Sequence, residues 1–139
     1  MREIKFRGKR IDNGEWVHGG IITSASRAWI KNNENLFINP LRINQSTADF
    51  RLDEVNPSTV GQYTGLKDIH DVEIYENDIV ELTIDDGISY NALIVYNDGG
   101  FCAIDGIDED YAISTYGIMR CDYDVKVIGN LFDNPELIK

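Results

Sequence analysis

The residues best suited to bind a ligand lie near the start of the chain, where cations alternate with apolar side chains. In an extended strand, side chains alternate between two faces, so three of these cations share the face opposite Ile4 and Phe6. Cations beside an aromatic ring are the groups that contact phosphates and stack on bases, but a solvated strand surface has the same composition. The candidate binding residues are Lys5, Arg7, Lys9, Arg10 and Trp16.

No catalytic residue is predicted. No Ser, Cys or Lys lies in a recognisable nucleophile motif, and no glycine-rich phosphate-binding loop occurs. The acidic stretch 105–110 lacks the ordered spacing and closing Glu of a calcium loop, so we expect a solvated loop there. His18, beside a glycine pair on a predicted strand, is expected to be exposed or hydrogen-bonded rather than a base.

The cysteines indicate neither a metal site nor a disulfide framework. Cys102 and Cys121 are 19 residues apart, without CxxC spacing and without a neighbouring His. We therefore expect two reduced, mostly buried thiols, as is usual in a cytoplasmic protein. The sequence predicts no metal, no cofactor and no enzymatic activity.

Charge is distributed unequally along the chain, which has 139 residues and a net charge of −11. Residues 1–55 hold nine basic and seven acidic side chains, whereas residues 56–139 hold four basic and 17 acidic ones. This balance argues against a broad basic face of the kind that binds duplex DNA. Opposite charge in the two parts fits a contact with a protein partner or between copies of the chain, and it equally fits a surface that only maintains solubility.

The element predicted to position the cations is a β-hairpin. Residues 3–7 alternate in strand periodicity, Asn13-Gly14 is a strong tight-turn dipeptide, and a second strand begins at Trp16. Gly19-Gly20 then allows that strand to bend or bulge.

The pattern between this hairpin and Pro57 is weaker. Short strands are predicted at 28–30 and 36–38. The apolar positions within 45–55 fit no helical stripe, so we expect a short helical turn or an irregular segment there. The run 56–59, Asn-Pro-Ser-Thr, is the best candidate for a boundary between two parts of the chain.

Short strands joined by Gly, Asp and Asn turns follow this boundary, and no internal repeat is visible. A charged loop spans 67–73, and Asn134-Pro135-Glu136 is typical of the start of a short helix. Short strands without long helices predict a small antiparallel barrel. The strands are expected at 60–65, 79–84, 88–96, 101–104 and 125–128.

Four stretches, in order and spanning nearly the whole chain, resemble the YopX family. They are MREIKFRGKR at 1–10 with GEWV at 14–17, TVGQYTGLKD at 59–68, EIYENDIV at 73–80, and VIGNLFDNPEL at 127–137. One difference is Asn77, where the family usually has Gly. Because Asn also tolerates positive φ, we expect the turn to be retained.

The resemblance implies a protein encoded mainly by bacteriophages and prophages of Gram-positive bacteria, with an SH3-like barrel in its C-terminal part. It implies no established biochemical activity and therefore no catalytic residue. The fold is expected to be mainly β, with an N-terminal β-rich (α+β) part at 1–56 and an SH3-like β-barrel at 57–139.

Three functions are compatible with this sequence. The first is a non-enzymatic phage or prophage accessory protein that acts as a protein-binding or adaptor module. The second is a single-stranded nucleic-acid-binding protein that uses the N-terminal cations and exposed aromatics. The third is an acidic nucleic-acid mimic that inhibits a host protein.

The first function is favoured, and nucleic acid is the less favoured partner. Short edge strands and opposite charge also predict self-association into a homo-oligomer. No apolar run reaches about 18 residues, so a transmembrane helix and a membrane partner are not expected. The expected location is the cytoplasm of the bacterial host cell.

Overall fold

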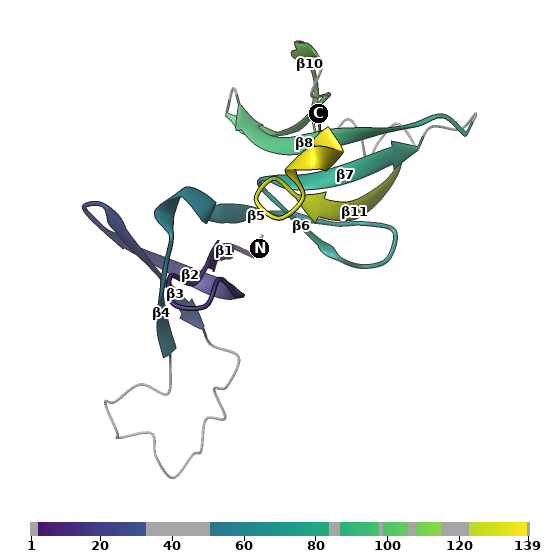
Figure 1. Cartoon of the computed structure of the whole chain (residues 1–139). Helices are drawn as coiled ribbons and strands as arrows, with labels where there is room; N and C mark the ends of the chain where they lie inside the picture. The colour runs from purple at the N-terminus through teal and green to yellow at the C-terminus, as the bar shows by residue number, and fades with distance from the viewer. Residues whose placement is uncertain are drawn as a thin grey trace. The chain divides into compact units, whose positions relative to one another are not determined.

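The structure, a computed structural model, describes residues 3–32, 51–83, 87–97, 99–105, 108–114 and 123–138 (Figure 1). Its regular structure is almost entirely antiparallel β-sheet, which confirms the mainly β prediction. The chain divides into two compact units, Glu3–Gln62 and Tyr63–Lys139. Strand β5 (Gly61–Lys67) begins in the first unit and continues into the second.

The first unit opens with the predicted hairpin. β1 pairs with β2 in the register Lys9↔Trp16, and Gly14 adopts φ +71° in the connection. β1 begins three residues later than residues 3–7 alone suggested, because pairing with β2 starts only at Phe6. The elements of this unit before β5 are β1 (Phe6–Lys9), β2 (Trp16–Ser24), β3 (Arg27–Asn32), β4 (Arg51–Val55) and the 3-10 helix η2 (Pro57–Thr59).

The pair Gly19-Gly20 marks the point where β2 changes partner. Residues up to Gly19 pair with β1, and residues from Gly20 onward pair with β3. Glycines carry no Cβ and tolerate the local backbone change that such a switch requires. The bend or bulge predicted there therefore corresponds to a transfer of the strand from one partner to the next.

Segment 51–55 is strand β4, so the helical turn or irregular segment predicted for these residues is wrong. β4 pairs with β3 in the register Ile30↔Asp53. Leu52 is 46% exposed whereas Asp53 is 5% exposed, which inverts the usual relation between burial and polarity. Non-local pairing fixes which face of a strand is buried, and here it overrides the local pattern. Segments 36–38 and 45–50 lie outside the described residues.

The end of β4 returns to the residues that follow β1. Val55 forms a bridge with Arg10, and the Asn56 N–H donates to the Lys9 carbonyl at 2.8 Å. Gly8 packs against Val55 so closely that a Cβ at position 8 would lie 2.9 Å from the Val55 side chain. The core of this unit consists of Ala28, Ile30 and Val55, covered by Phe6, Val17, Ile21 and Val60.

The second unit contains the remainder of β5, paired with β6, and a five-stranded sheet in the order β10-β9-β8-β7-β11. Its buried side chains gather around Val80, Leu82 and Ile94. Cys102 is buried, as expected, and Cys121 lies outside the described residues. The elements are β6 (Glu73–Tyr75), β7 (Asp78–Thr83), β8 (Ser89–Asn97), β9 (Gly100–Asp105), β10 (Asp108–Ser114), β11 (Asp124–Asn130) and the 3-10 helix η3 (Pro135–Ile138).

Most strands of this unit lie where they are predicted, and the short C-terminal helix is confirmed. The loop expected over 105–110 is wrong for Asp105, which ends β9, and for 108–110, which begin β10, where Asp108 pairs with Asp105. Within the described residues the sheet is open, since its pairings run from β10 at one edge to β11 at the other. These pairings form no closed barrel.

Both units share one strand order, although the sequence shows no repeat. In the first unit a four-strand meander, β1 to β4, is followed by β5, which pairs with β1. In the second a meander, β7 to β10, is followed by β11, which pairs with β7. The shared order is a property of hydrogen-bonded pairing and can therefore be met by unrelated side chains.

Candidate functional site

Two of the predicted cations stack on Trp16. The guanidinium carbon of Arg7 lies 4.6 Å from the centre of the Trp16 ring, and Lys9 Nζ lies 5.4 Å from it. Lys9 is directly opposite Trp16 in the β1–β2 pairing, which brings these side chains onto one face. Arg7 is only 8% exposed, so its guanidinium is largely shielded from solvent beside the aromatic ring.

The other two predicted cations contact carboxylates. Lys5 Nζ lies 3.3 Å from Glu3 Oε1. Arg10 Nη2 lies 2.6 Å from Asp12 Oδ2, and Arg10 Nε lies 3.6 Å from Asp53 Oδ1. The structure therefore brings Arg7, Lys9 and Trp16 together and places Arg10 in a separate cluster with acids.

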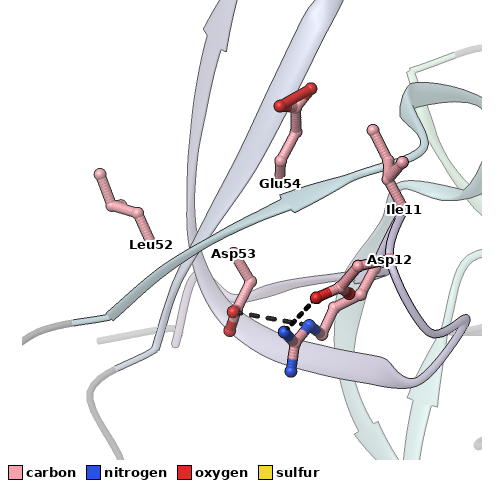
Figure 2. Close-up of a pocket in the computed structure, with 6 residues that line it drawn as sticks. Ile11, Asp12, Leu52, Asp53 and Glu54 are labelled. Carbon is pink, nitrogen blue, oxygen red and sulfur yellow. Dashed lines mark hydrogen bonds and ion pairs between the residues drawn. The ribbon is translucent and has the colours of Figure 1, made fainter.

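Arg10 belongs to a cavity of about 290 Å³ within the first unit. Figure 2 shows the carboxylates of Asp12 and Asp53 directed toward its guanidinium, one from the turn after β1 and one from β4. Apolar side chains from the same two segments complete the wall. The lining residues are Arg10, Ile11, Asp12, Leu52, Asp53 and Glu54.

Asp53 is the most deeply buried acid of this cavity. Its Oδ1 accepts a hydrogen bond from Arg51 Nε at 2.8 Å. Its Oδ2 is buried and has no hydrogen-bond partner. A buried acceptor without a donor is costly and is rare in native proteins.

Glu54 has its own partner on the neighbouring strand. Arg27 Nε donates to Glu54 Oε2 at 3.1 Å, and this side-chain hydrogen bonding lowers the pKa of Glu54. The same guanidinium lies 4.8 Å from the centre of the Trp29 ring. Each acid of the cavity is therefore accompanied by an arginine, and the local charge is close to balanced.

The sequence did not single out the three acids of this cavity. Asp53 and Glu54 belong to a segment whose strand character was missed, and Asp12 lies in the turn after β1. The run Leu52-Asp53-Glu54-Val55 has no period-two pattern, and Asp53 faces inward beside Val55. Only the pairing of β4 with β3 determines that the Asp53 side chain faces inward.

The turn at Asn77 is held by its backbone conformation and by backbone hydrogen bonds. Asn77 adopts φ +72°, so the predicted tolerance of positive φ is confirmed. Its N–H donates to the Ile94 carbonyl at 2.8 Å, and its carbonyl accepts from the Leu131 N–H at 2.9 Å. Asp78 is 2% exposed, and its Oδ2 accepts from the Tyr75 N–H at 2.8 Å. This turn fixes β6, β7 and β8 relative to one another within the second unit.

Metal-binding groups, membrane-spanning helices and the position of His18 were considered for the described residues. Among them, no group of three or more His, Cys, Asp or Glu side chains is arranged to hold a metal ion. No helix in this part of the chain has the length and apolar character needed to cross a membrane. His18 lies on β2 opposite Arg7 and is partly buried.

Comparison with known proteins finds a matching family model and similar solved structures. The crystal structure of protein EF1440 from Enterococcus faecalis resembles this chain with a TM-score of 0.57 and 20% identity, over 100% of both chains. At 20% identity this similarity shows a shared fold and nothing about function. No curated protein matches the chain. The family model described as YopX protein matches residues 5–139, and the chain therefore belongs to the YopX family.

Proposed function

We propose that this protein is a non-enzymatic accessory protein, encoded by a phage or prophage, that acts as a protein-binding or adaptor module. The observation that carries the proposal is an apolar surface on the outer face of β2, β3 and β4. Ile22 and Leu52 are 44% and 46% exposed there. Trp29 shares that face, because strand side chains alternate and its neighbours Ala28 and Ile30 are buried in the core.

The register places these groups close together. Ile22 pairs with Trp29, which pairs with Glu54, and Leu52 lies two residues from Glu54 on the same face of β4. Arg27 stacks on Trp29 while binding Glu54, so its planar group is presented in a fixed orientation. Trp and Arg beside exposed aliphatic side chains are the residues enriched in protein interfaces and in their energetic centres. This outer face therefore supports a protein partner.

The N-terminal cations support a nucleic-acid partner less well. Arg7 is largely buried against Trp16, and Arg10 is engaged by Asp12 and Asp53. Phosphate binding needs cations whose charge is available to release counterions from the nucleic acid. Contacts within the chain reduce that availability at both positions.

The test is affinity capture of tagged protein from a lysate of the bacterial cell that carries the gene. Ile22→Ser removes an exposed apolar group from the outer face, and Ile88→Ser is the matched control, because Ile88 is 57% exposed in the second unit. The wild type and Ile88→Ser are expected to capture the same protein in stoichiometric amount, and Ile22→Ser is expected to lose it. Absence of any stoichiometric protein, or equal capture by all three, would overturn the proposal.

A second measurement addresses the alternative partner. Fluorescence anisotropy with a labelled single-stranded oligonucleotide at low salt is expected to show no binding. Binding that weakens with salt and is reduced by Lys9→Gln would instead assign the protein to nucleic acid.

The proposal also retains an SH3-like arrangement of the second unit, a cytoplasmic location and self-association. Light scattering over a range of protein concentrations tests self-association. A monomer mass at every concentration would remove that part of the proposal.

A further inference from the structure

We propose that the outer edge of β4 binds an extended segment of another protein, which pairs with Leu52 as an added antiparallel strand. Two hydrogen bonds at the other end of β4 show which of its backbone groups face outward. The Ile11 N–H donates to the Glu54 carbonyl at 3.1 Å. The Asn56 N–H donates to the Lys9 carbonyl at 2.8 Å. Outward groups belong to every second residue of a strand, so the N–H and carbonyl of Leu52 also point away from β3.

The edge of β4 becomes free at Leu52. The segment after β1 pairs with this edge only as far as the bond from Ile11 to Glu54. Among the residues that the structure describes, none makes a backbone hydrogen bond to the outward groups of Leu52. An unpaired strand edge is a template for an extended segment, because main-chain hydrogen bonds supply the affinity and alternate side chains supply the specificity.

Strand β11 in the second unit shows the opposite case, an edge that the chain covers itself. The Val125 carbonyl accepts from the Ile69 N–H at 3.0 Å, and the Val127 N–H donates to Asp68 at 2.9 Å. The loop after β5 therefore occupies these outward groups of β11. The described part of the chain provides no such cover at Leu52, which leaves this position of β4 open to a segment from outside.

A cavity beside the free edge has room for a short length of one chain. It has a volume of about 290 Å³ and lies between β4 and the turn after β1 (Figure 2). Ile11 and Asp12 line it from the turn, and Leu52 and Glu54 line it from the strand. A second folded copy would bring its own β3 together with its β4 edge, whereas a single extended segment can enter a space of this size. The space therefore favours an extended peptide as the occupant.

The two faces of β4 predict the side chains of the bound segment. Figure 2 shows Leu52 and Asp53 directed to opposite sides of the strand. In an antiparallel pair, the residue opposite Leu52 has its side chain on the same face as Leu52, and its two neighbours lie on the other face. Leu52 is exposed, so an apolar residue opposite it gains contact. Asp53 already has Arg51 at 2.8 Å, so neutral polar neighbours leave that ion pair intact.

This inference rests on the proposed protein-binding function and specifies it, since it names an extended segment as the partner. Its test is a titration of the ¹⁵N-labelled full chain with the peptide acetyl-Ser-Thr-Val-Thr-Ser-amide, followed by NMR. The central valine is the apolar residue, and the flanking threonines are the neutral polar ones. Backbone signals of Ile11, Leu52 and Glu54 are expected to shift. Absence of a shift at these residues would overturn the proposal.

Two methylated peptides test the main-chain pairing itself. One carries an N-methyl group on the central valine, whose N–H would face Leu52, and the other carries it on the following threonine, whose N–H would face away. Methylation of the valine is expected to weaken binding by about tenfold or more, and methylation of the threonine to leave it nearly unchanged. Equal weakening by the two methyl groups would contradict an added antiparallel strand.

Two variants assign the binding to the edge of β4. Leu52→Pro removes the outward N–H and is expected to abolish peptide binding. The pairing of β4 with β3 does not use that N–H, so the sheet should be retained. Leu52→Ala, the matched control, keeps the N–H and should preserve the difference between the two methylated peptides. Equal peptide affinity in Leu52→Pro and the wild type would exclude this edge. The methylated peptides test the same contact in the wild type and do not depend on the fold of the proline variant.

Failure of this inference is distinguishable from failure of the proposed function. Ile22→Ser leaves the edge unchanged and is expected to bind the peptides as the wild type does. No peptide binding, together with capture of a partner that Ile22→Ser loses, would overturn the edge and leave the outer face standing. Light scattering that shows a wild-type dimer and a monomeric Leu52→Pro variant would assign the edge to a second copy and overturn the peptide.

Discussion

The carboxylate of Asp68 joins two segments that are 59 residues apart, because its Oδ2 accepts a hydrogen bond from the Val127 N–H at 2.9 Å. Its Oδ1 accepts from the N–H groups of His70 and Val72 at 2.8 and 2.9 Å. One side chain thus shapes the loop after β5 and connects it to β11. The charged loop predicted at 67–73 is therefore held by hydrogen bonds to the buried carboxylate of Asp68.

Replacing this acid with its isosteric amide is expected to destabilise the protein. In Asp68→Asn the amide oxygen can still accept from His70 and Val72, but the amide nitrogen faces the Val127 N–H, so that donor loses its partner. We expect a loss of about 2 kcal/mol in the free energy of unfolding, measured by urea denaturation. The matched control is Asp71→Asn, where an exposed acid contacts Lys67 at 3.7 Å and the expected change is below about 0.5 kcal/mol. Equal losses in both variants would contradict this role of Asp68.

The same acid predicts a pH dependence. Burial by itself raises the pKa of Asp68, but hydrogen bonds from the N–H groups of Val127, Val72 and His70 outweigh it and hold the pKa below its ordinary value. Stability from a lowered pKa is present above the unfolded pKa of about 3.9 and is lost as the pH falls through the folded pKa. The difference in stability between wild type and Asp68→Asn should therefore be constant near neutral pH and shrink below about pH 4. Urea midpoints measured from neutral to acidic pH test this, and a difference that grows on acidification would refute it.

The positive φ at Asn77 predicts which substitutions this turn tolerates. At φ +72°, Gly and Asn are tolerated, whereas Ala carries the cost of a left-handed conformation. Asn77→Gly is expected to change stability by less than about 0.5 kcal/mol, and Asn77→Ala to lower it by about 1 kcal/mol. Thermal unfolding of the three proteins checks the order. An Ala variant as stable as the Gly variant would show that the conformation at 77 is not what selects the residue.

Close packing at Gly129 predicts a steric effect. A Cβ at this position would lie 2.5 Å from Asn134 Oδ1, whereas a Cβ at Gly100 would meet nothing within 4 Å. Gly129→Ala is expected to cost about 1–3 kcal/mol, and Gly100→Ala, as control, much less. Because the clash is with one side chain, Asn134→Gly should recover part of the loss in the double variant. Denaturant unfolding of the single and double variants measures this coupling, and strictly additive losses would exclude the clash as the cause.

The sequence determined the elements whose signals are local. Asn13-Gly14 specified the first hairpin, and Gly19-Gly20 specified a bend in the second strand, because glycine conformations at turns and bends depend on few neighbours. Asn134 and Pro135 similarly specified the short C-terminal helix. The grouping of the N-terminal cations on one face followed from the alternation of side chains along a strand.

Only the tertiary structure decided how those cations are used and which acids form the cavity. Arg7 is buried against Trp16, and Arg10 is drawn to Asp53 on a strand more than 40 residues later in the chain. Asp53 faces inward because β4 pairs with β3 in one register, whereas the local sequence, with Leu52 and Val55 on opposite faces of the strand, favours neither orientation. Register is set by pairing with a distant strand, and a shift of one residue reverses every side chain, so no local pattern could have placed this site.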